Sequence, residues 1–113
     1  MADNSNKNSI LERNVARRIS KELLSMSGVS SLAGDGITKA IANTVLRKKD
    51  SVKGIDVSIA DEEIYVDLRI NVYYGINIPQ LSYDIQTKVK PIIEDMTNLK
   101  IKAINISVEG IEQ

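Results

Sequence analysis

The feature that most constrains the fold is a strict alternation of apolar and polar residues over residues 63–74. Successive side chains of a strand point to opposite faces of a sheet, so period two over this length predicts a long strand that is buried on one face only. The apolar set comprises Ile64, Val66, Leu68, Ile70, Val72 and Tyr74. The opposite set, which must face water or a partner, comprises Tyr65, Asp67, Arg69, Asn71 and Tyr73.

Composition narrows the class of protein. With 113 residues, 42% of them hydrophobic and 27% charged, the chain is expected to form one globular domain. The absence of cysteine and histidine removes disulfides, thiolate chemistry, the commonest general base and the commonest metal ligand. We therefore expect no metal site and no cofactor. The absence of cysteine also suits a reducing cytoplasm.

Charge and hydropathy limit the possible partners. The 15 basic and 15 acidic side chains cancel, whereas a dedicated nucleic-acid binder usually has a basic excess that neutralises phosphates. No run of apolar residues is long enough to span a bilayer, and the polar start of the chain has no signal-peptide pattern. The protein is therefore expected to be cytoplasmic and to reach a membrane only peripherally, through a partner.

The N-terminal part predicts a polar tail followed by a helix. Residues 1–8 are polar and rich in Asn, which favours a disordered tail, and residues 9–113 then form the domain. Ser9 and Glu12 have the spacing of a capping box, and Gly28 is expected to end the helix as a left-handed C-cap. The apolar stripe between them is Leu11, Val15, Ile19, Leu23 and Met26.

The opposite face of this helix carries four cations, Arg13, Arg17, Arg18 and Lys21. Such a face can attract anionic lipid or nucleic acid, but charges on a helix surface are more often simply solvated. A helix that buries its apolar stripe in the core cannot also insert that stripe into a bilayer. Direct lipid binding is therefore the less favoured hypothesis.

The middle of the chain predicts a turn, a helix and a β-hairpin. Val29 and Leu32 are expected to contact the core, while Gly34 and Gly36 permit a turn. The apolar spacing of residues 37–45 indicates a second, shorter helix that ends at the basic residues 47–49. Residues 55–59 alternate as a short strand, and a tight turn at residues 60–62 pairs this strand antiparallel with the long one.

A third helix follows the long strand. Asn77 and Pro79 suit its first turn, and its apolar face is Leu81, Ile85, Val89, Ile92, Ile93 and Met96. Pro91 lies inside this pattern and lacks the N–H that would bond the carbonyl of Thr87. The sequence therefore predicts a kink at Pro91 or an early helix end near Lys90.

A final alternating segment returns the chain to the sheet. Its inward residues are Ile104, Ile106 and Val108, and its outward residues are Asn105, Ser107 and Glu109. A strand, a helix and a returning strand form a crossover that is right-handed in nearly all proteins and makes the two strands parallel. The predicted fold class is therefore α+β: a two-layer sandwich whose three-stranded mixed sheet combines the hairpin with the right-handed strand–helix–strand crossover, with two to three helices on one face.

Several of these segments together resemble the alkaline shock protein family, small proteins of Gram-positive bacteria that include YloU-like members. The resemblance rests on VYYGINIP at residues 72–79, INISVEGI at residues 104–111, the G-V-x-x-L-A-G pattern of residues 28–34 and the acidic turn at residues 61–63. It covers roughly residues 10–111. Within the first of these segments, a turn and a helix start rather than a site are expected of Tyr74, Gly75, Asn77, Ile78 and Pro79.

The resemblance implies a non-enzymatic cytosolic protein of the cell-envelope stress response or of membrane lipid homeostasis. It also implies self-association into a homo-oligomer and recruitment to the membrane by a membrane-anchored protein. The family has no established catalytic residues, so the resemblance supplies none for this chain.

The residues themselves offer one candidate site and little catalytic chemistry. The carboxylates of residues 61–63 cluster on a hairpin turn, where such groups are usually solvated, and no nucleophile constellation is recognisable. Asp67 and Arg69, two apart on one strand face, predict a weak exposed ion pair worth about 0–1 kcal/mol. Because Tyr and Arg anchor many protein interfaces, the candidate interaction face is the polar set Tyr65, Asp67, Arg69, Asn71 and Tyr73. The same tyrosines leave a small RNA-binding α/β module as the alternative.

Overall fold

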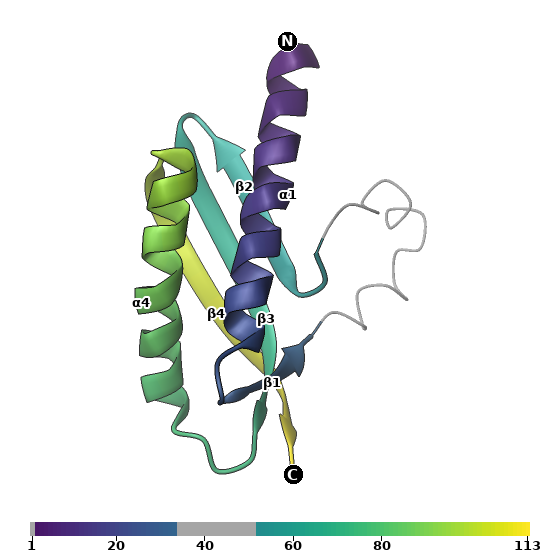
Figure 1. The fold of residues 1–113 in the computed structure, drawn as a ribbon, viewed down its shortest axis with the longest axis vertical. Helices are drawn as coiled ribbons and strands as arrows, with labels where there is room; N and C mark the ends of the chain where they lie inside the picture. Colours follow the sequence, from purple (N-terminus) through teal and green to yellow (C-terminus); the bar gives the residue numbers. More distant parts are fainter. Residues whose placement is uncertain (1, 34–51) are drawn as a thin grey trace.

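The structure is a computed structural model that describes residues 2–33 and 52–113. Helices α1 (Ala2–Leu24) and α4 (Ile78–Thr97) lie side by side on one face of a four-stranded sheet (Figure 1). The strands are β1 (Val29–Leu32), β2 (Ile55–Ala60), β3 (Glu63–Tyr73) and β4 (Lys100–Glu112). The α+β class is therefore confirmed. The glycine turn predicted at residues 34 and 36, the short helix at residues 37–45 and the basic residues 47–49 lie outside the described residues.

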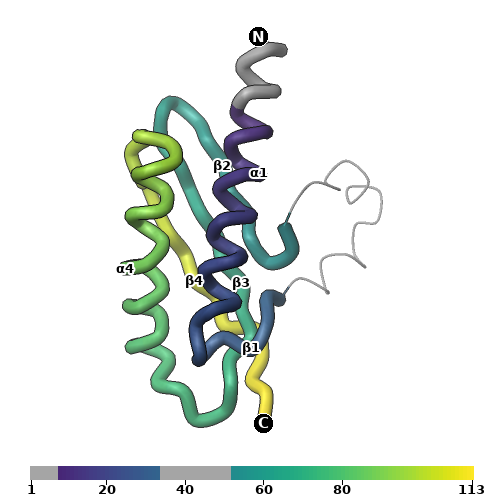
Figure 2. Tube along the Cα trace, in the orientation of Figure 1, coloured from purple at the N-terminus to yellow at the C-terminus, as the bar shows by residue number. Residues whose placement is uncertain are grey.

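Strand β3 is the centre of the sheet. On one side it pairs in parallel with β4 along its whole length, from the Glu63–Lys100 pair to the Tyr73–Glu112 pair. On its other side it pairs antiparallel first with β2 and then with β1. Figure 2 follows the chain along β3, back through α4 and forward again along β4. The hairpin, the parallel crossover pair and the mixed sheet are as predicted.

The fourth strand, β1, corrects the predicted count of three strands. Its four residues were expected only to contact the core, and Val29 and Leu32 do so, at 5% and 7% exposure. The sequence pattern did not predict β1, because this strand is short and irregular. Its register against β3 shifts between Val29 and Ser31, so its polar and apolar residues do not alternate.

The β2–β3 turn has the shape that a tight hairpin requires. Ala60 pairs with Glu63, which leaves Asp61 and Glu62 as a two-residue loop. Both have positive φ, 54° and 65°, as in a type I′ turn, whose twist matches that of the flanking strands. The turn is where the sequence predicted it.

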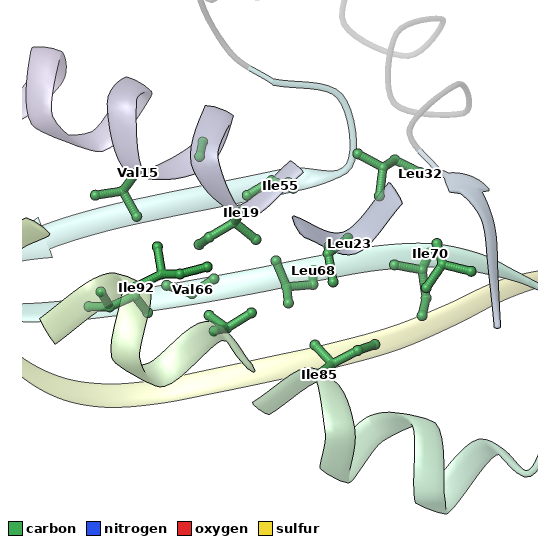
Figure 3. Close-up of a cluster of buried hydrophobic side chains, with 14 of the residues drawn as sticks. Val15, Ile19, Leu23, Leu32, Ile55, Val66, Leu68, Ile70, Ile85 and Ile92 are labelled. Atoms are coloured by element: carbon green, nitrogen blue, oxygen red, sulfur yellow. The ribbon is translucent and has the colours of Figure 1, made fainter. Parts of the chain in front are cut away.

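The core is aliphatic and lies between β3 and the two helices (Figure 3). The five inward side chains of β3 are at most 1% exposed: Ile64, Val66, Leu68, Ile70 and Val72. α1 contributes Val15, Ile19 and Leu23, and α4 contributes Leu81, Ile85, Val89, Ile92 and Ile93. Each fully buried side chain of this kind contributes about 1.5–3 kcal/mol. Two predicted core residues are exposed instead, Met96 at 36% and Tyr74, in the turn after β3, at 71%.

Both ends of α1 differ from the prediction. The helix begins at Ala2 rather than Ser9, so residues 2–8 are helical where a disordered tail was expected. No Gly or Pro interrupts these residues, and extending an existing helix adds one hydrogen bond per residue. The helix ends at Leu24, and Gly28 is not its left-handed cap. Gly28 instead makes room for α4, because a Cβ there would lie 3.2 Å from Leu81 Cδ1.

Helix α4 continues through Pro91 to Thr97, so the predicted early end near Lys90 is wrong. Pro91 is exposed, while Val89, Ile92 and Ile93 beside it are buried, and this burial offsets the lost backbone hydrogen bond. The kink stays a prediction. Both helix ends are capped: the Asn77 side chain accepts from Gln80 N at 3.0 Å, and Asn98 closes the helix with φ of 58°.

Two glycines with positive φ provide a matched test of the junction between β1, β2 and β3. A Cβ on Gly54 (φ 78°) would lie 2.6 Å from Ala33 O and 2.8 Å from Arg69 O, whereas a Cβ on Gly75 (φ 88°) would have no neighbour within 4 Å. Gly75→Ala should destabilise by about 1–2 kcal/mol, the usual left-handed penalty. Gly54→Ala should destabilise by roughly 3 kcal/mol or more, because backbone must also move.

Urea denaturation of the two variants measures this difference. Equal losses of unfolding free energy would show that the backbone contacts around Gly54 do not constrain the fold.

Candidate interaction face on the open side of the sheet

The structure places all five predicted interaction residues on one surface. Tyr65, Asp67, Arg69, Asn71 and Tyr73 alternate along β3 with its buried residues, so they point away from the side that α1 and α4 cover (Figure 1). We call this set the open face. The burial of the inward residues determines which residues form the open face. When one set of alternating side chains is fully buried, the other set must point outward.

The charged groups of the open face pair across strands rather than along β3. Arg69 Nη1 contacts Asp56 Oδ2 of β2 at 3.1 Å. Asn105 Nδ2 of β4 donates to Asp67 Oδ1 at 2.8 Å. The predicted ion pair between Asp67 and Arg69 is therefore wrong. Asn105 is the direct partner of Asp67 on β4, where Cβ atoms are about 5 Å apart. Asp56 is diagonal to Arg69 on β2, a separation that the long arginine side chain spans.

Arg69 relieves an unfavourable arrangement of carboxylates. Asp56 and Asp67 are direct partners in the antiparallel register of β2 and β3, and like charges in such positions destabilise a sheet. Arg69 supplies the compensating cation to Asp56. Its side chain is 24% exposed, and its Nε is buried without a hydrogen-bond partner. The guanidinium is therefore held in place at the centre of the face.

Asn71 is held between both neighbouring strands. Its Nδ2 donates to Ser31 Oγ of β1 at 2.9 Å. On the other side, a Cβ on Gly110 of β4 would lie 2.8 Å from Asn71 Oδ1, so the glycine leaves room for the amide. The two tyrosines mark the ends of the open face, at 37% exposure for Tyr65 and 44% for Tyr73. Tyr73 lies eight positions after Tyr65 along the strand, a separation of about 26 Å.

Sequence reasoning identified the members of the open face but not their partners. Asp56 and Asn105 were expected to point outward from the alternation of their own strands. Their contacts with Arg69 and Asp67 depend on the register between strands, which no local pattern gives. Ser31 was missed because β1 was not expected to be a strand.

The other sequence candidates occupy turns. Asp61 and Glu62 form the exposed hairpin loop. Tyr74 and Gly75 form the turn after β3, where Tyr74 N donates to Glu112 O at 2.6 Å and Gly75 has φ of 88°. Ile78 and Pro79 begin α4 behind the Asn77 cap. Over the described ranges, no cluster of three or more acidic, histidine or cysteine side chains is arranged to hold a metal ion.

Comparison with known proteins identifies the family. A family model described as having a cell envelope-related function matches residues 2–113. The chain belongs to the alkaline shock protein 23 family. The resemblance inferred from the sequence is thereby confirmed. In this family member, no helix of the described segments is both long and apolar enough to cross a membrane.

Curated relatives of this chain include proteins of Bacillus subtilis and Streptococcus pyogenes. The uncharacterized protein YloU of Bacillus subtilis is 31% identical over 84 residues, which cover 74% of this chain and 70% of YloU. The uncharacterized protein YqhY of the same organism is 30% identical over 77% of this chain and 63% of its own length. The uncharacterized protein Spy1614 of Streptococcus pyogenes serotype M6 is 32% identical, over 75% and 70% respectively. No solved structure matches the chain.

The charge arrangement of the open face can be tested with a double-mutant cycle. Arg69→Met removes the contact with Asp56 and leaves Asp56 and Asp67 opposed, which should cost about 1 kcal/mol of unfolding free energy, since Asp56 is 49% exposed and partly screened. Adding Asp56→Asn should recover part of that loss, because the repulsion disappears.

Urea denaturation at low and high salt measures the loss caused by Arg69→Met and the recovery caused by Asp56→Asn. Both changes in unfolding free energy should become smaller as the salt concentration rises. If Asp56→Asn instead added its own loss to that of Arg69→Met, the opposed carboxylates would not be the source of the effect.

Proposed function

We propose that this protein is a non-enzymatic interaction protein of the cell envelope. It acts from the cytoplasmic side in envelope stress or membrane lipid homeostasis, associates with itself and is recruited to the membrane by an anchored protein. The family description supports the envelope role. The observation that carries the proposal is the open face, a fixed polar surface with an arginine at its centre and a tyrosine at each end.

The chemistry of the open face favours a protein partner. Tyr and Arg are enriched among residues that dominate binding energy at protein interfaces. Arg69 is oriented by Asp56, and Asn71 by Ser31, so binding would cost little side-chain entropy at these positions. The polar groups bond to neighbours in pairs and do not converge on one point, which supports a contact surface rather than a catalytic site.

RNA binding through the same tyrosines is the weaker hypothesis. Modules that stack RNA bases place aromatic rings close enough to hold neighbouring bases, whereas Tyr65 and Tyr73 are about 26 Å apart. Asp56, Asp67 and Glu109 lie on the outward side of the sheet and would repel phosphates. Tight RNA binding in a salt-titrated anisotropy assay near physiological ionic strength would reverse this ranking.

Recruitment through a partner is favoured over direct lipid binding. Val15, Ile19 and Leu23 form the apolar face of α1 and are fully buried in the core. They cannot insert into a bilayer while the domain is folded. Failure of the purified protein to float with anionic liposomes is therefore expected.

Two adjacent tyrosines allow a matched test of the open face. Tyr73 lies on the face, whereas Tyr74 lies in the following turn and is 71% exposed. After mild cross-linking in cells, the wild-type protein should capture a membrane-anchored protein. Tyr73→Ser should reduce this capture by roughly tenfold, the effect of losing an interface anchor worth about 1–2 kcal/mol. Tyr74→Ser should leave the capture intact.

Circular dichroism of both variants controls for folding. Equal capture by the wild-type protein and Tyr73→Ser would exclude the open face as the contact surface. Capture of RNA or ribosomal proteins in place of a membrane-anchored protein would favour the alternative function.

A further inference from the structure

Strand β4 has an outer edge that pairs with no strand in the described part of the chain. It is 13 residues long and pairs with β3 along one side only. A helix side chain reaches its outer edge at one point, where Gln86 Nε2 donates to Ile104 O at 3.3 Å. An unpaired edge of this length presents a row of backbone donors and acceptors, and proteins normally cover or pair such edges.

The edge on the opposite side of the sheet is covered better. Helix α1 packs against β2, and Glu12 Oε2 accepts from Ile59 N at 2.9 Å. This contact satisfies a backbone donor of β2 with a charged acceptor, which is among the stronger kinds of hydrogen bond. The edge that still needs a partner is therefore that of β4.

The residues of β4 are self-complementary about Ile106. Asn105 and Ser107 are small and polar on the outward side, and Ile104 and Val108 are β-branched on the core side. Further out, Ile101 corresponds to Ile111 and the cation Lys100 corresponds to the anion Glu112. A two-fold axis through Ile106 would place each residue opposite its counterpart in a second copy. The same side of the sheet is matched in these pairs, and the register shifts of β4 against β3 fall near its two ends, at residues 102 and 109.

The backbone of β4 is oriented for such pairing. Ile104 O accepts from the Gln86 side chain of α4, and we infer from this that the carbonyl lies at the outer edge of β4. Backbone groups of alternate residues point the same way, so Ile106 and Val108 also present their N–H and C=O groups to the outer edge. In an antiparallel pair centred on Ile106, these are the groups that form the inter-strand hydrogen bonds.

Helix α4 adds an aromatic residue close to the same centre. α4 runs opposite to β4 (Figure 2). The hydrogen bond between Gln86 and Ile104 makes these two residues level with each other. Ile106 lies about 7 Å further along the strand than Ile104. This distance corresponds to about four residues of a helix, so Ile106 is level with the turn of α4 that contains Tyr83. Tyr83 is on the same side of the helix as Gln86 by its spacing of three and is 66% exposed.

We propose that β4 pairs antiparallel with β4 of a second copy about a two-fold axis at Ile106, with Tyr83 of each copy beside the axis. The inference rests on the proposed self-association and assigns it to a sheet edge. The two sheets become one continuous sheet, and the Gln86 side chain gives up Ile104 O to the incoming strand. The open faces remain available to the membrane-anchored partner.

A charge swap at the ends of β4 tests this pairing. Lys100→Glu and Glu112→Lys should each raise the dimer Kd about tenfold, because both Lys100–Glu112 contacts become repulsive at once. The double variant should restore the Kd of the wild-type protein. Arg17→Glu on α1 is the control for net charge and should leave the Kd unchanged. Analytical ultracentrifugation over a wide concentration range measures the Kd, and thermal denaturation controls for folding.

Cysteine cross-linking tests the register, because the chain has no cysteine of its own. The pairing places Asn105 opposite Ser107 of the second copy in a non-hydrogen-bonded position, with Cα atoms about 4.5 Å apart, within the range for a disulfide. An equal mixture of Asn105→Cys and Ser107→Cys should therefore cross-link several-fold faster than either variant alone. Like positions in the two copies are diagonal, about 7–8 Å apart, which is too far.

The outcomes separate this inference from the proposed function. A wild-type dimer that the charge swap does not weaken, or a mixture that cross-links no faster than its components, would overturn the edge pairing and leave self-association standing. A protein that stays monomeric at all concentrations would overturn both. Neither result bears on the open face, whose role is decided by the capture experiment with Tyr73→Ser.

Discussion

The whole molecule depends on the burial of one side of β3. Its five inward side chains are at most 1% exposed and face both helices, while β1, β2 and β4 all take their register from its backbone. A shift of one residue would bring Asp67 and Arg69 into the core and expose Val66 and Leu68, which would cost far more than the net stability of a domain of this size. The register of β3 is therefore fixed by its core side, and the spacing of the open face is fixed with it.

That dependence explains what the sequence could predict. Period two in residues 63–74 and the apolar spacing of α4 are signals repeated over many residues, so the long strand, the helix and the members of the open face were all predicted. β1 was missed because four residues with a register shift carry no repeated signal. The sequence left open whether α4 ends near Lys90 or continues through Pro91, because the burial of Ile92 and Ile93, which offsets the proline, is a tertiary effect. The partners of Arg69 and Asp67 were also not predicted, because they depend on the register between strands, which is likewise set by tertiary structure.

The open face differs from a catalytic site in how its polar groups are used. Arg69 pairs with Asp56, Asp67 with Asn105 and Asn71 with Ser31, so each contact joins β3 to a neighbouring strand. A catalytic site needs groups that converge on a reacting atom and lie within a pocket. These contacts instead hold a broad surface in one conformation, which lowers the entropy lost when another surface binds it.

The two proposals combine into one physical picture. A two-fold axis perpendicular to the sheet leaves the open faces of both copies on the same side, so pairing through β4 would present two identical faces on one continuous sheet. A partner anchored in a membrane is restricted to a plane, where two such molecules can engage the two faces together. The second contact is then intramolecular, and modest affinity at each open face becomes strong attachment of the dimer. Weak surfaces of the kind formed by Tyr65, Arg69 and Tyr73 would thus suffice, because pairing at the β4 edge doubles their number without any change in their chemistry.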